Sequence, residues 1–235
     1  SLGAQFERFD LAAPGLAAAP APPTHTPFTL AFAAPDLSSA KGLETFMRLV
    51  DRLVREGDGA QMRFVALGAA DAPTYGYEQQ WVQRRYPGGE IKTFLDHLRQ
   101  LYPAAAAVVE APGKLPYAQF AATLGQVDLF LYPLRYGVAN WGLMEILARG
   151  GCVLGSNWGF VPELIEHDVN GLLLPDQDDA WIDAIRQLRA DPARRARYAQ
   201  AAVATGQRFH IAQVAPAYMQ LFERAIAQRR GRVGG

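Results

Sequence analysis

Two charged side chains stand where a phosphate-bearing or hydroxyl-rich ligand could bind. The first is Lys41, in the small polar loop 35–42 between an apolar run and a helical pattern. A lysine at a helix start opposes the helix dipole, so it is electrostatically useful there when an anion binds beside the free backbone N–H groups. A solvated surface lysine explains this loop equally well, so both interpretations stay open.

The second charged side chain is Glu145, in the second turn of the helix that begins within the loop 133–145. It lies among Leu143, Met144, Ile146 and Leu147. A carboxylate flanked so closely by apolar residues needs hydroxyl donors or a cation. The hydroxyls of a ribose would serve, and so would a partner within the protein.

Two further loops follow apolar runs. In the loop 111–116, a glycine and two prolines fix a tight path that could press the backbone against a flat ligand such as a base, although an ordinary turn explains them equally well. In the loop 156–163, Glu163 stands at a helix beginning and is interpreted as a capping or dipole-complementing residue.

Other common templates are missing from the sequence. It contains no G-x-G-x-x-G, no Walker loop and no H-E-x-x-H. The four histidines are scattered without ligand spacing, so no metal site is predicted, and His97 and His210 are interpreted as surface or packing residues. The single cysteine, Cys152, excludes an internal disulfide and is predicted to be inert.

The composition is that of an ordinary globular protein. The 23 Lys and Arg residues balance 23 Asp and Glu residues, which argues against a nucleic-acid-binding protein. Half of the residues are hydrophobic, enough for a sizeable core. No apolar run approaches the length of a membrane helix and no signal peptide is visible, so we expect a cytoplasmic location.

Short apolar runs alternate with helical patterns along most of the chain. The runs expected to be strands are 28–34, 62–67, 105–109, 127–132, 152–155 and 172–174, and helices are expected at 43–54 and 91–101 among others. Strands separated by helices pair in parallel, so the sequence predicts an α/β fold with a doubly wound parallel sheet. In such sheets ligands bind beyond the carboxyl ends of the strands, where the loops described above begin.

The two ends of the chain differ from this central part. The segment 11–27 is almost wholly Ala, Pro, Gly and Thr, which is typical of an extended linker. The C-terminal third is expected to be purely helical, with one apolar face around Trp181 and Leu188 and a helix start at Asp191-Pro192. The last helix, 211–229, carries an apolar stripe of Val214, Tyr218, Leu221, Phe222 and Ile226.

Five segments, in order and spacing, resemble the C-terminal nucleotide-sugar-binding domain of GT-B fold glycosyltransferases of family 4, also called group 1. They are 37–42, 127–133, 142–154, 159–165 and 170–174, and the likeness covers nearly everything from Phe28 to Ile226. The segment Gly3 to Phe9 is similar to the one by which such enzymes enter this domain. The resemblance implies a Rossmann-like half of a GT-B fold.

The resemblance also implies roles for particular residues. Lys41 matches the lysine that neutralises the donor diphosphate, Glu145 the glutamate that holds the donor ribose, and Leu115 the place where the backbone meets the base. The amides of Gly142 and Leu143 match helix-start N–H groups that meet phosphate. No cofactor and no metal ion are implied, and the catalytic residues stay unassigned.

Two positions depart from the family pattern. An arginine usually found a few residues before the lysine is replaced by Asp36, and the first acid of the E-x(7)-E pattern falls on Gly137. The first change weakens neutralisation of the diphosphate, and the second removes a contact to the transferred sugar. Arg135, in the same loop as Gly137, is an additional candidate because its charge could compensate for Asp36.

The resemblance implies a division of the chain into three parts. Residues 1–27 are an entry segment and linker, residues 28–210 bind the donor, and residues 211–235 form a helix and tail that would pack on an N-terminal domain. The implied function is transfer of a sugar from a nucleoside-diphosphate sugar to a glycan or lipid-linked acceptor, as in polysaccharide biosynthesis, in the cytoplasm or at the inner membrane face.

Two alternatives follow from the same segments. The first is a non-catalytic module with a degenerate donor site, suggested by Asp36 and Gly137. The second concerns the last helix: without an N-terminal domain its stripe predicts either self-association, together with the linker 11–27, or folding of the helix onto its own sheet domain.

Overall fold

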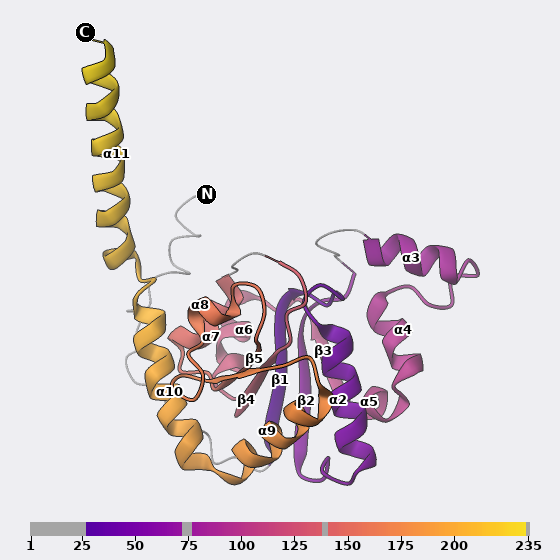
Figure 1. The fold of residues 1–235 in the computed structure, drawn as a ribbon. Coiled ribbons are helices and arrows are strands. Elements are labelled where there is room, and N and C mark those ends of the chain that lie inside the picture. The colour runs from indigo at the N-terminus through magenta and orange to yellow at the C-terminus, as the bar shows by residue number, and fades with distance from the viewer. Residues whose placement is uncertain (1–26, 72–76, 138–140, 234–235) are drawn as a thin grey trace.

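A single six-stranded parallel sheet organises the chain in the computed structural model, which describes residues 27–71, 77–137 and 141–233 (Figure 1). The strand order is β3-β2-β1-β4-β5-β6. The strands are β1 (Phe28–Asp36), β2 (Met62–Ala69), β3 (Val109–Gly113), β4 (Leu129–Tyr132), β5 (Val153–Ser156) and β6 (Leu172–Leu174). Every pairing is parallel, which confirms the predicted doubly wound sheet.

Helices cover both faces of this sheet and create two hydrophobic cores. Successive strand residues point to opposite faces, so Leu30 and Phe32 enter one core while Ala31 and Ala33 enter the other. The helices are α2 (Leu43–Arg55), α3 (Tyr77–Arg85), α4 (Phe94–Leu101), α5 (Pro103–Val108), α6 (Tyr117–Leu124), α7 (Trp141–Ala148), α8 (Val161–Leu164), α9 (Asp178–Ala190), α10 (Pro192–Gln207) and α11 (Ile211–Val233). The first core contains residues of α2, α4, α5 and α9, and the second contains residues of α6, α7 and α8.

The segment 105–109 corrects the sequence-based expectation of a strand. Most of it belongs to α5, and β3 begins only at Val109. Pro103 occupies the first turn, where its missing N–H and fixed φ suit a helix, and the alanines that follow are the best helix formers. The apolar run is therefore mostly a helix turn, in which Ala105 is buried and Val108 is 39% exposed.

The helix expected over 91–101 is shorter than predicted. It begins at Phe94, because Thr93 forms a capping box with Asp96: the Thr93 Oγ1 accepts from the Asp96 N–H and the Asp96 carboxylate accepts from the Thr93 N–H. Ile91 is buried although it precedes the helix.

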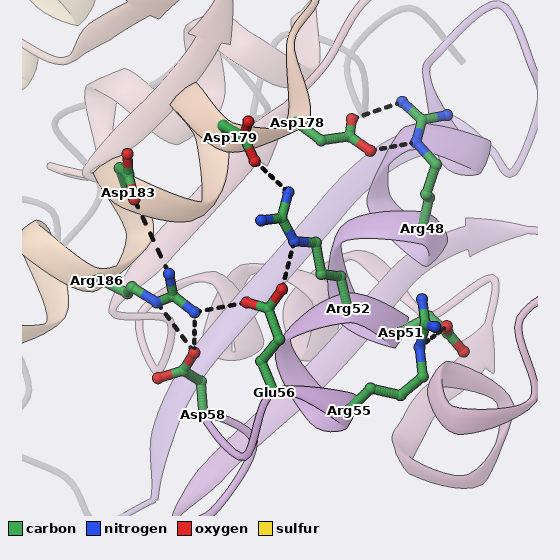
Figure 2. Close-up of polar contacts among 10 residues, drawn as sticks. All are labelled: Arg48, Asp51, Arg52, Arg55, Glu56, Asp58, Asp178, Asp179, Asp183 and Arg186. Carbon is green, nitrogen blue, oxygen red and sulfur yellow. Dashed lines mark hydrogen bonds and ion pairs between the residues drawn. The ribbon is translucent and has the colours of Figure 1, made fainter.

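Ion pairs between α2 and α9 fix the pose of α2, whose first turn follows Lys41. Arg48 binds Asp178 with two hydrogen bonds of 2.7 and 2.9 Å, and Arg52 binds Asp179 at 2.6 Å. Figure 2 shows these pairs together with the contacts of Arg186 from α9 to the C-terminal end of α2. Single exposed pairs contribute roughly 0–1 kcal/mol each, so their value here lies in joining two helices at several points.

The helices α9 and α11 carry similar apolar stripes with opposite surroundings. The predicted face of α9 (Trp181, Ile182, Ile185 and Leu188) is fully buried, and Asp191 caps α10 by accepting from the Arg194 N–H. Figure 1 shows α11 extending away from the sheet and its covering helices. The α11 side chains Tyr218, Leu221, Phe222 and Ile226 are between 51% and 58% exposed.

Of the two outcomes expected for this last helix, folding onto its own sheet domain is therefore not what the structure shows. Self-association stays a prediction, and the linker 11–27 that would join in it lies outside the described residues. Within the described residues, none of the helices combines the length and apolar character that crossing a membrane requires.

Candidate functional site

A cavity of about 400 Å³ opens at the carboxyl ends of β1, β2 and β3; we call it the β1–β3 cavity. Its lining is Ala33, Ala34, Pro35, Leu67, Gly68, Gly113, Lys114, Leu115, Tyr117, Phe120, Gly142 and Glu145. This is the edge where doubly wound sheets bind ligands. The lining includes three residues singled out in the sequence: Leu115 from the loop before α6, and Gly142 and Glu145 from α7.

Glu145 holds its carboxylate at the wall of this cavity, with 18% of the side chain exposed. The Tyr117 hydroxyl donates a hydrogen bond of 2.5 Å to the Glu145 Oε1, and the Arg149 Nη2 lies 3.9 Å from the same oxygen. The sequence left open whether Glu145 has a partner within the protein, and the structure shows that Tyr117 and Arg149 are such partners. Both contacts engage Oε1, and no hydrogen bond from a described residue engages Oε2.

Tyr117 is a site residue that the sequence analysis missed. Burial, and next the hydrogen bond to Glu145, raises the pKa of its hydroxyl, so the phenol stays protonated and donates at neutral pH. Tyr117 opens α6, and Phe120 stands three residues later on the same helix face, where both line the cavity. The signal in the sequence was this aromatic pair directly after the Pro- and Gly-rich loop 111–116.

Lys41 lies where the two halves of the sheet meet, and not in the lining of the β1–β3 cavity. Its side chain is buried, and a side chain at Gly137 would place its Cβ 3.5 Å from the Lys41 Nζ. The backbone N–H groups of Arg135 and Tyr136 both donate to the Ala40 carbonyl oxygen at 3.0 Å. The loop with Lys41 is thus joined to the loop after β4, beside the point where the strand order reverses.

Gly42 permits this close approach of the two loops. Its φ of +88° is a left-handed conformation that favours glycine, and a Cβ there would lie 1.9 Å from the Pro133 carbonyl oxygen. No side chain fits at that distance. The close contact with Pro133 therefore explains why a glycine stands immediately before α2.

Two carboxylates hold the loop that precedes Lys41. Asp36, where the resemblance led us to expect an arginine, is buried and accepts a hydrogen bond of 2.8 Å from the Ser38 hydroxyl. Glu78 of α3 accepts from both the N–H and the hydroxyl of Ser39. These hydrogen bonds give both carboxylates a structural role in the loop.

Gly142 and Leu143 lie in the first turn of α7, whose amide N–H groups point toward the start of the helix. Gly142 lines the β1–β3 cavity, whereas the Leu143 side chain is fully buried in the second core. Of these two residues, only Gly142 contributes to the lining of the β1–β3 cavity.

Arg135 lies elsewhere. Its guanidinium is 3.9 Å from the Asp176 carboxylate, and it lines a second cavity of about 280 Å³. We call this the β4–β6 cavity because the loops after β4, β5 and β6 form most of it. The structure therefore does not bring Arg135 to the residues of the β1–β3 cavity.

The remaining candidates have structural surroundings. His97 packs against the Trp81 ring at 4.7 Å between centroids and its Nδ1 lies 2.7 Å from the Tyr86 hydroxyl, as expected of a packing residue. Burial raises the pKa of the Cys152 thiol to about 12, which keeps it protonated. Among the described residues, no three His, Cys, Asp or Glu side chains gather in a way that could hold a metal ion.

Comparison with known proteins finds both similar sequences and similar structures. The chain is 25% identical over 235 residues to a D-inositol 3-phosphate glycosyltransferase of Saccharomonospora viridis, covering 98% of this chain and 51% of the relative. The structure is similar to sucrose-phosphate synthase from Thermosynechococcus elongatus, with a TM-score of 0.69 and 21% identity over 88% of this chain and 47% of that one. It is also similar to Anabaena HepE in complex with UDP, with a TM-score of 0.66 and 19% identity over 85% of this chain and 49% of that one.

The chain spans about half the length of these proteins. The two structural likenesses show a shared GT-B type of fold, as the resemblance implied. The family model for glycosyl transferases group 1 matches residues 23–205, which is most of the chain and includes both cavities. The chain therefore belongs to the group 1 glycosyltransferase family.

Proposed function

We propose that the chain is the donor-binding half of a glycosyltransferase that moves a sugar from a nucleoside-diphosphate sugar to a glycan or lipid-linked acceptor. The observation that carries this proposal is the meeting of Leu115, Gly142 and Glu145 in the wall of the β1–β3 cavity. Because the chain spans about half of its relatives, the acceptor site would lie in the remainder of the protein.

The β1–β3 cavity suits a nucleoside. Its wall combines the apolar side chains of Leu115 and Phe120 with glycine backbone, a surface on which a flat base can lie. The Glu145 carboxylate is then within the same cavity to accept hydrogen bonds from ribose hydroxyls. With Tyr117 held on Oε1, the Oε2 atom is the one offered to the ribose.

The diphosphate would lie between this cavity and Lys41. The ammonium of Lys41 and the first-turn N–H groups of α7 would stabilise the negative charge that develops on the leaving diphosphate during transfer. Asp36 makes this place less positive than the family pattern provides. The second candidate function, a non-catalytic module with a degenerate donor site, is favoured by that buried carboxylate together with Gly137.

Calorimetric titration of the chain with UDP and GDP tests the proposal. HepE was crystallised with UDP and with UDP-glucose, so UDP is the first probe. We expect one of the two nucleotides to bind, and Glu145→Gln to weaken it by about 1.5–3 kcal/mol, the value of a charge-assisted hydrogen bond. The matched control is Glu163→Gln, an exposed carboxylate in the first turn of α8, outside both cavities.

Binding that survives Glu145→Gln unchanged would assign this carboxylate a structural role with Tyr117 and Arg149. Indifference of the parent chain to both nucleotides would reject donor binding. The catalytic and non-catalytic alternatives separate in the full-length protein: release of UDP or GDP from a sugar nucleotide, lost in Lys41→Ala, supports the transferase, and tight binding without release supports the module.

A further inference from the structure

The β4–β6 cavity has exposed aromatic side chains, whereas the aromatic side chains of the β1–β3 cavity, Tyr117 and Phe120, are half-buried. Its lining is Thr45, Pro133, Leu134, Arg135, Tyr136, Ser156, Asn157, Trp158, Leu174, Pro175, Asp176 and Trp181. Tyr136 and Trp158 belong to this lining yet are 67% and 60% exposed. Large aromatic side chains exposed at a cavity mark a place where a ligand covers them.

The polar side chains of the same cavity fit hydroxyl groups. Asn157 offers an amide donor and acceptor, Asp176 a carboxylate, and Arg135 a planar set of donors. The 3.9 Å pair between Arg135 and Asp176 leaves this place without a surplus of positive charge, so it is poorly suited to a phosphate. Aromatic faces beside neutral or paired polar groups suit a ring whose C–H faces can stack on the aromatics and whose hydroxyl groups can form hydrogen bonds with the polar groups.

Hydrogen bonds among the loops fix the base of this cavity. The Ser156 hydroxyl donates to the Leu134 carbonyl oxygen at 2.9 Å, and the Asn157 N–H donates to the Leu174 carbonyl oxygen at 2.8 Å. The Trp181 Nε1 donates to the Pro175 carbonyl oxygen at 2.8 Å. These contacts join the loops after β4, β5 and β6, so the site is formed before any ligand arrives.

The two cavities lie at one edge of the sheet, and their linings share no residue. The loops 35–42 and 133–137 each contribute to one of them, and these loops come together beside Lys41 and Gly137, which line neither cavity. The β1–β3 cavity covers one half of the strand order, the β4–β6 cavity covers the other, and Arg135 and Tyr136 of the second directly precede Gly137. A ligand in the β4–β6 cavity therefore lies across the Lys41 junction from a nucleoside in the β1–β3 cavity.

We propose that the β4–β6 cavity binds a pyranose ring, stacked on Trp158 and Tyr136 and hydrogen-bonded through Asn157 and Asp176. This proposal rests on the proposed glycosyl transfer for its ligand class. The volume of about 280 Å³ lies at the small end of ligand pockets and suits one ring. The ring belongs to the donor sugar or to a unit of the acceptor glycan, and the experiment separates these sources.

Trp158→Ala tests the proposal, with Tyr218→Ala as the matched control because Tyr218 is similarly exposed, on α11. Affinities of parent and variants are measured by calorimetry for UDP, GDP, UDP-glucose and GDP-mannose. Saturation-transfer NMR is recorded with methyl glucoside, methyl mannoside and maltose. Circular dichroism checks the fold, and Asp176→Asn, whose side chain is 74% exposed, provides a second variant.

If the ring is the donor's, Trp158→Ala weakens a sugar nucleotide at least fivefold while UDP and GDP change less than twofold. If it is the acceptor's, the saturation transfer to a glycoside or maltose falls at least fivefold and sugar nucleotide affinities stay. The proposal is overturned if no sugar-bearing probe responds to Trp158→Ala or Asp176→Asn, or if Tyr218→Ala has the same effect. If the parent chain binds neither UDP nor GDP, the proposed function is wrong. The NMR experiment with the methyl glycosides and maltose then still tests whether this cavity binds a sugar.

Discussion

The β1–β3 and β4–β6 cavities lie along the same edge of one sheet and are built from different kinds of side chain. In the first, the half-buried side chains of Leu115 and Phe120 lie beside the Glu145 carboxylate, which accepts a hydrogen bond from Tyr117. In the second, exposed aromatics stand beside Asn157 and Asp176. A half-buried apolar wall with one oriented acceptor suits a nucleoside, whereas exposed aromatic faces beside polar groups suit a sugar ring.

Two loops connect the cavities: Pro35 of the loop 35–42 lines the β1–β3 cavity, and Pro133 of the loop after β4 lines the β4–β6 cavity. We call the contact between these loops the junction. Gly42 and Pro133 touch there, and Lys41 lies beside Gly137. Changes at the junction should therefore affect both cavities, and changes within one cavity should affect that cavity alone.

The largest effect is expected from Gly42→Ala. The new Cβ would require the Pro133 loop to move, at a cost of about 3 kcal/mol in unfolding free energy, and both nucleotide and glycoside binding should fall. Gly57→Ala is the control, because its φ of +87° is similar and no atom lies within 4 Å of the added Cβ; it should cost only about 1 kcal/mol. Denaturant unfolding measures both, and equal costs would contradict the close contact at the junction.

A smaller effect is expected from Tyr117→Phe. Loss of the hydroxyl that orients the Glu145 carboxylate should weaken nucleotide affinity by about 0.5–1.5 kcal/mol, a typical hydrogen-bond contribution. Glycoside binding in the β4–β6 cavity should not change. Calorimetry with UDP and GDP is the measurement, and tighter nucleotide binding would mean that Tyr117 blocks the carboxylate instead of orienting it.

The smallest effect on nucleotide affinity is expected from Arg135→Ala. The guanidinium is 41% exposed, pairs with Asp176 and lines only the β4–β6 cavity, so nucleotide affinity at low salt should change by less than about 0.5 kcal/mol. A loss of tenfold or more would show that Arg135 compensates for Asp36, as its place in the sequence suggested, and would remove the separation between the cavities.

The fold was largely predictable because apolar periodicity reports burial. The stripe of α9 and five of the six strands were recognised in this way, but the same signal does not say what covers a helix: α11 has a similar stripe, and its side chains are exposed. Pattern also failed at 105–109, where Pro103 and a run of alanines favour helix over strand.

The candidate site was predictable only where a residue belongs to a local motif. Glu145, Gly142 and Leu115 follow from loops at strand ends and from the family resemblance. The Tyr117–Glu145 contact joins residues 28 positions apart on two helices, and the β4–β6 cavity joins three loops, so neither is visible in local spacing. Arg135 was an additional candidate for the diphosphate because of its place in the loop, and that place says nothing about the direction of its side chain.

The crystal structure of the chain with UDP or GDP tests the central claim most directly. We predict the base against Leu115 and Phe120 in the β1–β3 cavity, the ribose hydroxyls on the Glu145 carboxylate, and the diphosphate near Lys41. A nucleotide bound in the β4–β6 cavity, or one whose ribose makes no contact with Glu145, would contradict it.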